Sequence, residues 1–124
     1  MKRGNGRALT RRPILATLPP VDNAAGAHIS ERSWQGTVLD LFRFHGWRCY
    51  HTHDSRRSAA GFPDLVCVHP QRGCVFCELK RETGRLSPSQ TEWLDALSAA
   101  GQRVFVLRPS SWRDAVAIAQ GAPS

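Results

Sequence analysis

A helix whose first turn is fully specified by its sequence lies between two strongly β-forming segments in the second half of the chain. The stretch SPSQTEWLDALSAAG begins with Ser87 as N-cap and a proline in the first turn, and Gln90 completes a capping box. Gly101 follows its end. The segment 74–80, CVFCELK, precedes this helix and the apolar segment 103–107, RVFVL, follows it. A strand, a helix and a further strand in this order predict a partly parallel sheet covered by helices.

The preceding segments add one helix and two strands. Apolar residues recur at helical spacing between Ser30, the expected N-cap, and Gly46, the expected stop: Trp34, Val38, Leu41 and Phe42. Residues 47–52 predict a short strand, and residues 64–68 predict a strand that pairs with 74–80 in an antiparallel hairpin around HPQRG. A short final helix is expected over 111–120. The sequence therefore predicts an α/β fold, with a central mixed β-sheet flanked by helices in the order α-β-β-β-α-β-α.

Charge divides the chain into a basic arm and one domain. The 124 residues include 17 Lys and Arg against 10 Asp and Glu, a net charge of +7, which favours a nucleic-acid partner. Residues 1–28 hold five of the basic residues and one acid and are rich in Gly, Pro, Ala and Asn, which predicts a flexible arm. Weak DNA contact and a solvated tail without a role both stay open for this arm. We expect one domain over 29–120 and a short tail over 121–124.

The apolar segments are short. No run approaches the roughly 20 residues of a membrane-spanning helix. Residues 14–18 follow paired arginines but end at two prolines, so they are too short for an export signal. We therefore expect a cytoplasmic protein without membrane contact, whose four cysteines are reduced.

Two metal chemistries overlap in residues 73–84, GCVFCELKRETG. Cys74 and Cys77 form a C-x-x-C, half of a zinc signature, whereas Glu78 and Lys80 form an E-x-K. In a strand, residues three apart point to opposite faces and residues two apart share a face. This alternation separates the cysteines, which we expect to be small core residues, and unites Glu78 with Lys80. A zinc-stabilised adaptor is therefore the less favoured alternative.

The hairpin register decides whether a second carboxylate joins Glu78. If residue 68 opposes residue 74, then Asp64 opposes Glu78 with Cβ atoms roughly 5 Å apart. Two carboxylates at that separation repel each other unless a cation lies between them, and oxygen ligands suit Mg²⁺. Lys80 would then contact the attacked phosphate or the nucleophilic water. A register slipped by one residue would place the carboxylates on opposite faces and leave an ordinary surface Glu-Lys pair.

Four motifs in a fixed order resemble the PD-(D/E)xK nuclease superfamily and, more narrowly, the VRR-NUC (virus-type replication-repair nuclease) domain. They are a Glu at the start of the first helix, G-x-P-D-L, E-x-K and G-R-L-S-x-x-Q, found here at Glu31, residues 61–65, Glu78 with Lys80, and residues 84–90. The resemblance extends over residues 30–109, and the order α-β-β-β-α-β is the core of that superfamily.

The resemblance implies a Mg²⁺- or Mn²⁺-dependent endonuclease that hydrolyses phosphodiester bonds in DNA. Asp64 and Glu78 would be metal ligands, the backbone carbonyl of Leu79 would add another, and Lys80 would help to activate water. Glu31 would either ligate the metal, directly or through water, or only stabilise the first helical turn.

For the other polar residues, a functional and a purely structural interpretation are both open. Gln90 either contacts the site or only completes the capping box. Five residues are candidates for phosphate contacts, against ordinary solvated side chains: Arg56, Arg57, Ser58, Arg81 and Arg85. His51 and His53 share a strand face and are interpreted as surface or phosphate-contacting groups rather than metal ligands.

The resemblance further suggests replication, repair or recombination intermediates as substrates, including branched junctions, in a prokaryotic or phage-infected cell. A homodimer is compatible with a family member of this size. The alternative from a different class is a non-catalytic nucleic-acid-binding module on the same fold. Clustered carboxylates that face a polyanion favour the nuclease, because a binding module gains nothing from them.

Overall fold

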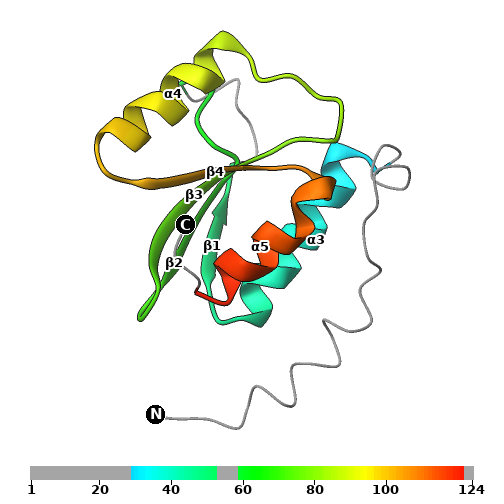
Figure 1. Ribbon diagram of the computed structural model, residues 1–124, viewed down its shortest axis with the longest axis vertical. Coiled ribbons are helices and arrows are strands. Elements are labelled where there is room, and N and C mark those ends of the chain that lie inside the picture. Colours follow the sequence, from blue (N-terminus) through cyan, green and yellow to red (C-terminus); the bar gives the residue numbers. More distant parts are fainter. Residues whose placement is uncertain (1–28, 53–58, 122–124) are drawn as a thin grey trace, which may run out of the picture.

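The sheet of the computed structural model, which describes residues 29–52 and 59–121, has four strands in the order β1-β2-β3-β4 (Figure 1). The first two pairs are antiparallel and the pair β3 and β4 is parallel. The strands are β1 (Arg48–His51), β2 (Leu65–His69), β3 (Gly73–Leu79) and β4 (Arg103–Leu107). The predicted mixed sheet is confirmed.

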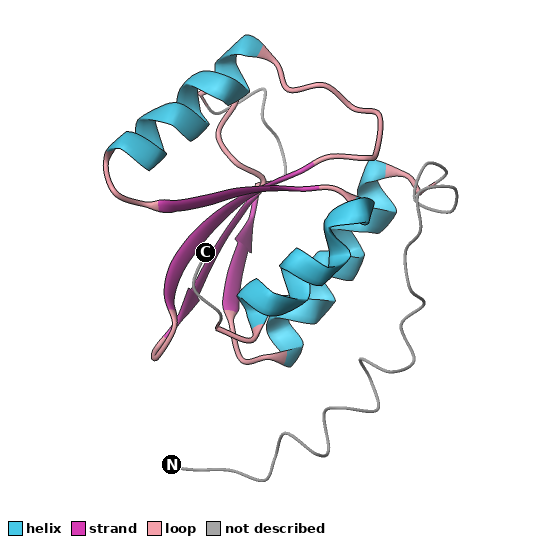
Figure 2. Cartoon of the chain, viewed as in Figure 1, coloured by secondary structure: helices cyan, strands magenta, loops and turns pink. Residues whose placement is uncertain are grey.

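Helices cover both faces of the sheet. Figure 2 shows two helices side by side on one face and a third on the opposite face. The helices are α3 (Glu31–Phe44) and α5 (Trp112–Ala119) on the first face and α4 (Pro88–Ala99) on the other. A 3-10 turn, η2 (Pro109–Ser111), precedes α5 and moves its start from the predicted Ser111 to Trp112. The Ser111 N–H bonds to the Arg108 carbonyl three residues back, which closes the tighter turn.

Both long helices begin at the predicted caps. Ser30 caps α3 by accepting a hydrogen bond from the Ser33 N–H at 3.1 Å. Ser87 caps α4 through a complete capping box with Gln90. Since each cap satisfies backbone N–H groups that have no partner within the helix, the starting points of α3 and α4 are fixed by local sequence.

Of the two β2–β3 registers that the sequence left open, the structure has the one that brings Asp64 and Glu78 together. Val68 opposes Cys74 and Val66 opposes Phe76, so the next residues along, Asp64 and Glu78, fall at the same end of the hairpin. Toward the turn, the strands pair at one further position, His69 with Gly73. The connecting loop is therefore 70–72 rather than 69–73.

The two faces of the sheet have different environments. The face toward α3 and α5 is fully buried and consists of Leu65, Cys67, Val75, Cys77 and Leu79, each 0% exposed. Cys74 lies outside this core, so the C-x-x-C cysteines diverge as the strand alternation predicts. On the opposite face, Phe62 bridges the sheet and α4, since its ring makes edge contacts with Phe76 and Trp93.

Two indole N–H groups join distant elements inside the core. Trp34 of α3 donates to the Leu107 carbonyl at the end of β4, at 2.8 Å, and Trp47 donates to the Ala119 carbonyl at the end of α5, at 2.9 Å. Both rings are buried, and Trp34 thereby confirms the apolar helix face that the sequence predicts. These bonds fix α3 relative to the end of β4 and β1 relative to α5.

Several predictions from the sequence concern residues outside the described part. These are the basic arm over 1–28, the residues of the tail from 122 on, His53, and the loop residues Arg56, Arg57 and Ser58. None of the described helices combines the length and apolar character needed to span a membrane.

Gly61 allows the loop before β2 to approach α4 more closely than any other residue would. Its φ is +90°, a conformation that side chains disfavour. A Cβ at this position would lie 2.5 Å from the Ser89 carbonyl oxygen and 2.7 Å from the Gln90 nitrogen. The loop and the first turn of α4 are therefore in direct backbone contact.

We expect Gly61→Ala to lower the free energy of unfolding by more than the roughly 1–2 kcal/mol that positive φ alone costs. Gly73→Ala measures that conformational cost, because Gly73 has a φ of +86° and nothing within 4 Å of its Cβ position. Gly36 lies in the open on α3, where alanine should stabilise by up to about 1 kcal/mol. Urea unfolding of the three variants checks this order, and equal losses for Gly61→Ala and Gly73→Ala would contradict the close approach.

Candidate active site

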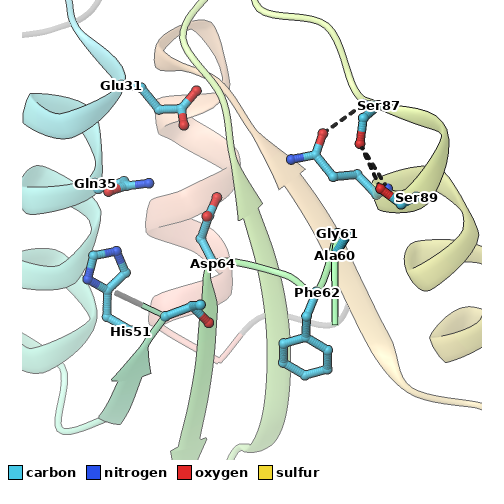
Figure 3. Close-up of a pocket in the computed structure, with 11 residues that line it drawn as sticks. Glu31, Gln35, His51, Ala60, Gly61, Phe62, Asp64, Ser87 and Ser89 are labelled. Atoms are coloured by element: carbon cyan, nitrogen blue, oxygen red, sulfur yellow. Dashed lines mark hydrogen bonds between the residues drawn. The ribbon is translucent and has the colours of Figure 1, made fainter. Parts of the chain in front are cut away.

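A polar pocket of about 470 Å³ lies where the first turns of α3 and α4 meet the start of β2. Its walls come from four separate parts of the chain: Glu31, Gln35, His51, Thr52, Ala60, Gly61, Phe62, Asp64, Ser87, Ser89 and Gln90. Figure 3 shows the Asp64 carboxylate pointing into the space between Glu31 on one side and Ser87 and Ser89 on the other.

Asp64 is held in place by the backbones of both neighbouring strands. Its Oδ2 atom accepts a hydrogen bond from the Leu79 N–H at 2.9 Å, and its carbonyl accepts one from the Thr52 N–H at 3.0 Å. The side-chain bond crosses the hairpin to the residue after Glu78. Asp64 and Glu78 are thus joined through the backbone of β3 as well as by the register.

Glu78 is the buried acid of the site. Its side chain is 1% exposed, and it is the one charged residue in the buried set of the described chain. Oε2 accepts a hydrogen bond from Gln90 Nε2 at 2.9 Å. Oε1 is buried and has no hydrogen-bond partner. A buried carboxylate oxygen without a donor is costly, which makes it a strong candidate ligand for a cation.

The electrostatics show how close the charged groups are. Burial and, after it, the negative charge of Asp64 and hydrogen-bonding contact with its carboxyl raise the pKa of Glu78 to about 9. The positive charge of Lys80 opposes this rise in pKa, and the charge of Glu31 adds to it. The four groups therefore belong to one electrostatic environment, although Glu31 lies on α3, Asp64 directly before β2, Glu78 on β3 and Lys80 directly after β3.

Gln90 performs both of the functions that the sequence left as alternatives. Its Oε1 atom accepts from the Ser87 N–H at 2.8 Å, which closes the capping box. Its Nε2 atom donates to Glu78. The first turn of α4 and the orientation of the Glu78 carboxylate therefore depend on one amide.

Glu31 lines the pocket from the first turn of α3, one turn before the Trp34 anchor. In the described ranges, 29–52 and 59–121, no three His, Cys, Asp or Glu side chains are arranged to hold one metal ion. This leaves the zinc adaptor without a ligand set among these residues. For the same reason Glu31 does not form a three-ligand group with Asp64 and Glu78, so contact of Glu31 with a metal stays a prediction.

The structure adds pocket residues that the sequence did not single out for the site, notably Gln35, Phe62 and Ser89. Gln35 is four residues after Glu31, so helical spacing alone could have placed it on the same face. Phe62 and Ser89 depend on the approach of the loop to α4, which no local pattern reveals.

The predicted basic residues of the connection between β3 and α4 lie beside the pocket rather than in it. Lys80 is half-buried directly after β3, and its N–H bonds to the Leu107 carbonyl at 3.1 Å. Arg81 and Arg85 are exposed and do not line the pocket. Their contact with phosphates stays a prediction.

Comparisons with known proteins agree with this geometry. The profile of the VRR-NUC domain matches residues 27–111, which include every described element up to η2. The chain belongs to the VRR-NUC domain family.

Two solved structures resemble this chain. One described as a VRR_NUC domain is 26% identical, with a TM-score of 0.59, and the match covers 68% of this chain and 90% of that chain. A second, described as a VRR_NUC domain protein, is 18% identical with a TM-score of 0.58 over 74% of this chain and 86% of that chain, and so supports the fold alone. A comparison with curated proteins found no match.

VRR-NUC domains are in general nucleases, and this chain has the nuclease-type α/β fold of the family. Its four motifs are far apart in sequence but meet at one place: Glu31, the loop at Gly61–Asp64, Glu78 with Lys80, and Ser87–Gln90.

We expect the cation-free protein to lose stability as the pH rises from about 4.5, the ordinary pKa of a Glu side chain, to about 9, the raised pKa of Glu78. In this window the folded protein keeps a proton that the unfolded chain has released, so the free energy of unfolding falls by at most about 1.4 kcal/mol per pH unit. Urea unfolding in EDTA across this range measures the slope. Glu78→Gln, which carries no titrating carboxyl, should flatten it, and an unchanged slope in that variant would contradict the assignment.

Proposed function

We propose that this VRR-NUC domain is a divalent-metal-dependent endonuclease that hydrolyses phosphodiester bonds in DNA. The observation that carries the proposal is the pairing of Asp64 with a buried Glu78 that has one oxygen without a partner, beside Lys80. When both are ionised, carboxylates held together in this way repel each other and a phosphate backbone unless a cation joins them. A protein that only bound DNA would lose affinity through such a pair.

The residues present fit a hard divalent cation. The available donors are oxygens: the Asp64 and Glu78 carboxylates, with the Leu79 carbonyl as an added ligand. Oxygen ligands suit Mg²⁺ and Mn²⁺, and a site with few protein ligands suits an ion that retains water or takes substrate oxygens. Such an ion, when bound, supplies charge neutralisation at the phosphate and a lower pKa for the water that attacks it.

The protein side chains orient the reacting groups. The Leu79 N–H and the Gln90 amide fix Asp64 and Glu78, so neither carboxylate has to reorganise as charge develops. Lys80 would contact a non-bridging phosphate oxygen or the nucleophilic water. Arg56, Arg57, Ser58, Arg81 and Arg85 would contact the DNA backbone.

The reaction is an in-line hydrolysis. A water oxygen bonds to phosphorus, the bond from phosphorus to the 3′ oxygen breaks, and the leaving oxygen takes up a proton. The products are a 5′-phosphate and a 3′-hydroxyl. Within this function, we propose replication, repair or recombination intermediates as substrates, including branched junctions, in the cytoplasm of a prokaryotic or phage-infected cell.

We expect the wild-type protein to cleave plasmid or branched DNA with Mg²⁺ or Mn²⁺ and to be inactive with EDTA. Asp64→Asn keeps the shape of the side chain but removes a charged ligand, and Lys80→Gln removes the positive charge. Each should lower the cleavage rate by at least about 100-fold. Rates on labelled DNA measure this.

Asp95→Asn is the matched control, because Asp95 is an exposed acid on α4 outside the pocket. It should cleave at the wild-type rate. Full activity of Asp64→Asn or Lys80→Gln would overturn the site, and DNA binding without cleavage of any substrate would favour the binding module.

A further inference from the structure

Arg108 follows β4 directly, and its guanidinium binds the backbone of the turn that comes after β3. Its Nη1 atom donates to the carbonyl of Arg81 at 2.9 Å and to that of Gly84 at 2.6 Å, with a longer contact of 3.4 Å to the Glu82 carbonyl. Arg108 is half-buried. Its Nη1 group is thus turned toward the protein backbone, which distinguishes it from the exposed Arg81 and Arg85.

The same turn is closed by two further bonds. The Gly84 N–H donates to the Arg81 carbonyl at 3.1 Å, and Glu82 Oε1 accepts from the Ser110 N–H at 3.0 Å. Residues 81–84 are therefore fastened to the segment 108–110 by an arginine from one side and a carboxylate from the other. The bonds donated by the Arg108 guanidinium and the bond accepted by the Glu82 carboxylate are charge-assisted, which makes them stronger than ordinary hydrogen bonds.

Lys80 lies against this turn. Its backbone is held by the carbonyl of Leu107, the residue before Arg108. Its side-chain stem passes over Gly84, because a Cβ placed on Gly84 would lie 3.4 Å from Lys80 Cδ. The direction of the Lys80 side chain consequently depends on where the turn is fixed.

We propose that Arg108 is a positioning residue for Lys80: it fixes the 81–84 turn so that the Lys80 ammonium is directed at the substrate phosphate. This inference rests on the proposed function. Arginine suits the task because its guanidinium keeps its charge and is planar, so that donation to several carbonyls holds one geometry. A lysine at this position is a point charge on a flexible stem and reproduces these bonds poorly.

The experiment compares Arg108→Gln and Arg108→Lys with wild type in steady-state cleavage of DNA. We expect kcat to fall about 10- to 100-fold, as is typical when a supporting contact of a reactive group is lost, with KM changed less than about 3-fold. Arg103→Gln is the matched control, since Arg103 also donates to a carbonyl, that of Arg72, but at the start of β4. It should retain the wild-type kcat.

A double-mutant cycle separates positioning from general stability. In the Lys80→Gln background, Arg108→Gln should cost less than about 2-fold, because the side chain that it positions is gone. A purely structural role of Arg108 would instead give the same loss in both backgrounds. Hydrogen exchange without DNA provides a readout that does not need activity: the Gly84 amide should exchange faster in Arg108→Gln than in wild type.

The outcomes separate this inference from the function on which it rests. Cleavage by the wild type with an unchanged kcat in both Arg108 variants overturns the positioning role and leaves the nuclease intact. Additive losses in the cycle overturn it too. A wild type that cleaves no DNA overturns the proposed function and the positioning role together.

Discussion

Two carboxyl groups that would repel each other if both were ionised are held together at the end of the β2–β3 hairpin, and the surrounding structure is organised around that pair. Asp64 is fixed by the Leu79 N–H, and Glu78 by Gln90, yet one Glu78 oxygen stays buried without a donor. Burial and the neighbouring charge both disfavour the ionised form of Glu78. A fold that keeps such an arrangement carries a local cost, which a bound cation would offset.

Residues at the end of β4 hold several parts of the site in place. The Leu107 carbonyl accepts hydrogen bonds from the Trp34 indole and from the Lys80 N–H, so a single oxygen connects α3 and the segment after β3. The next residue, Arg108, holds the 81–84 turn. The strand β4 thereby positions Glu31 and Lys80 relative to the carboxylate pair. This strand runs parallel to β3 because the helix α4 makes the crossover between them.

Much of this could be predicted from the sequence because it depends on local rules. The capping box at Ser87 and the alternation that separates Cys74 from Cys77 follow from turn chemistry and strand periodicity, whereas the pairing of Val68 with Cys74 is one of two registers that the sequence leaves open. What could not be predicted depends on tertiary contacts between side chain and backbone. The second bond of Gln90 to Glu78, the approach of Gly61 to Ser89 and the hold of Arg108 on its turn join segments whose spacing in the chain carries no periodic signal.

The central claim is that Asp64 and Glu78 share one divalent cation, and the most direct test is anomalous diffraction from crystals of the wild-type protein grown with Mn²⁺. We expect an anomalous peak from Mn²⁺ between the two carboxylates, in contact with Asp64 and with the Glu78 oxygen that has no hydrogen-bond partner. The peak should vanish in crystals of Asp64→Asn grown in the same way. Well-ordered side chains with no peak between them would contradict the account.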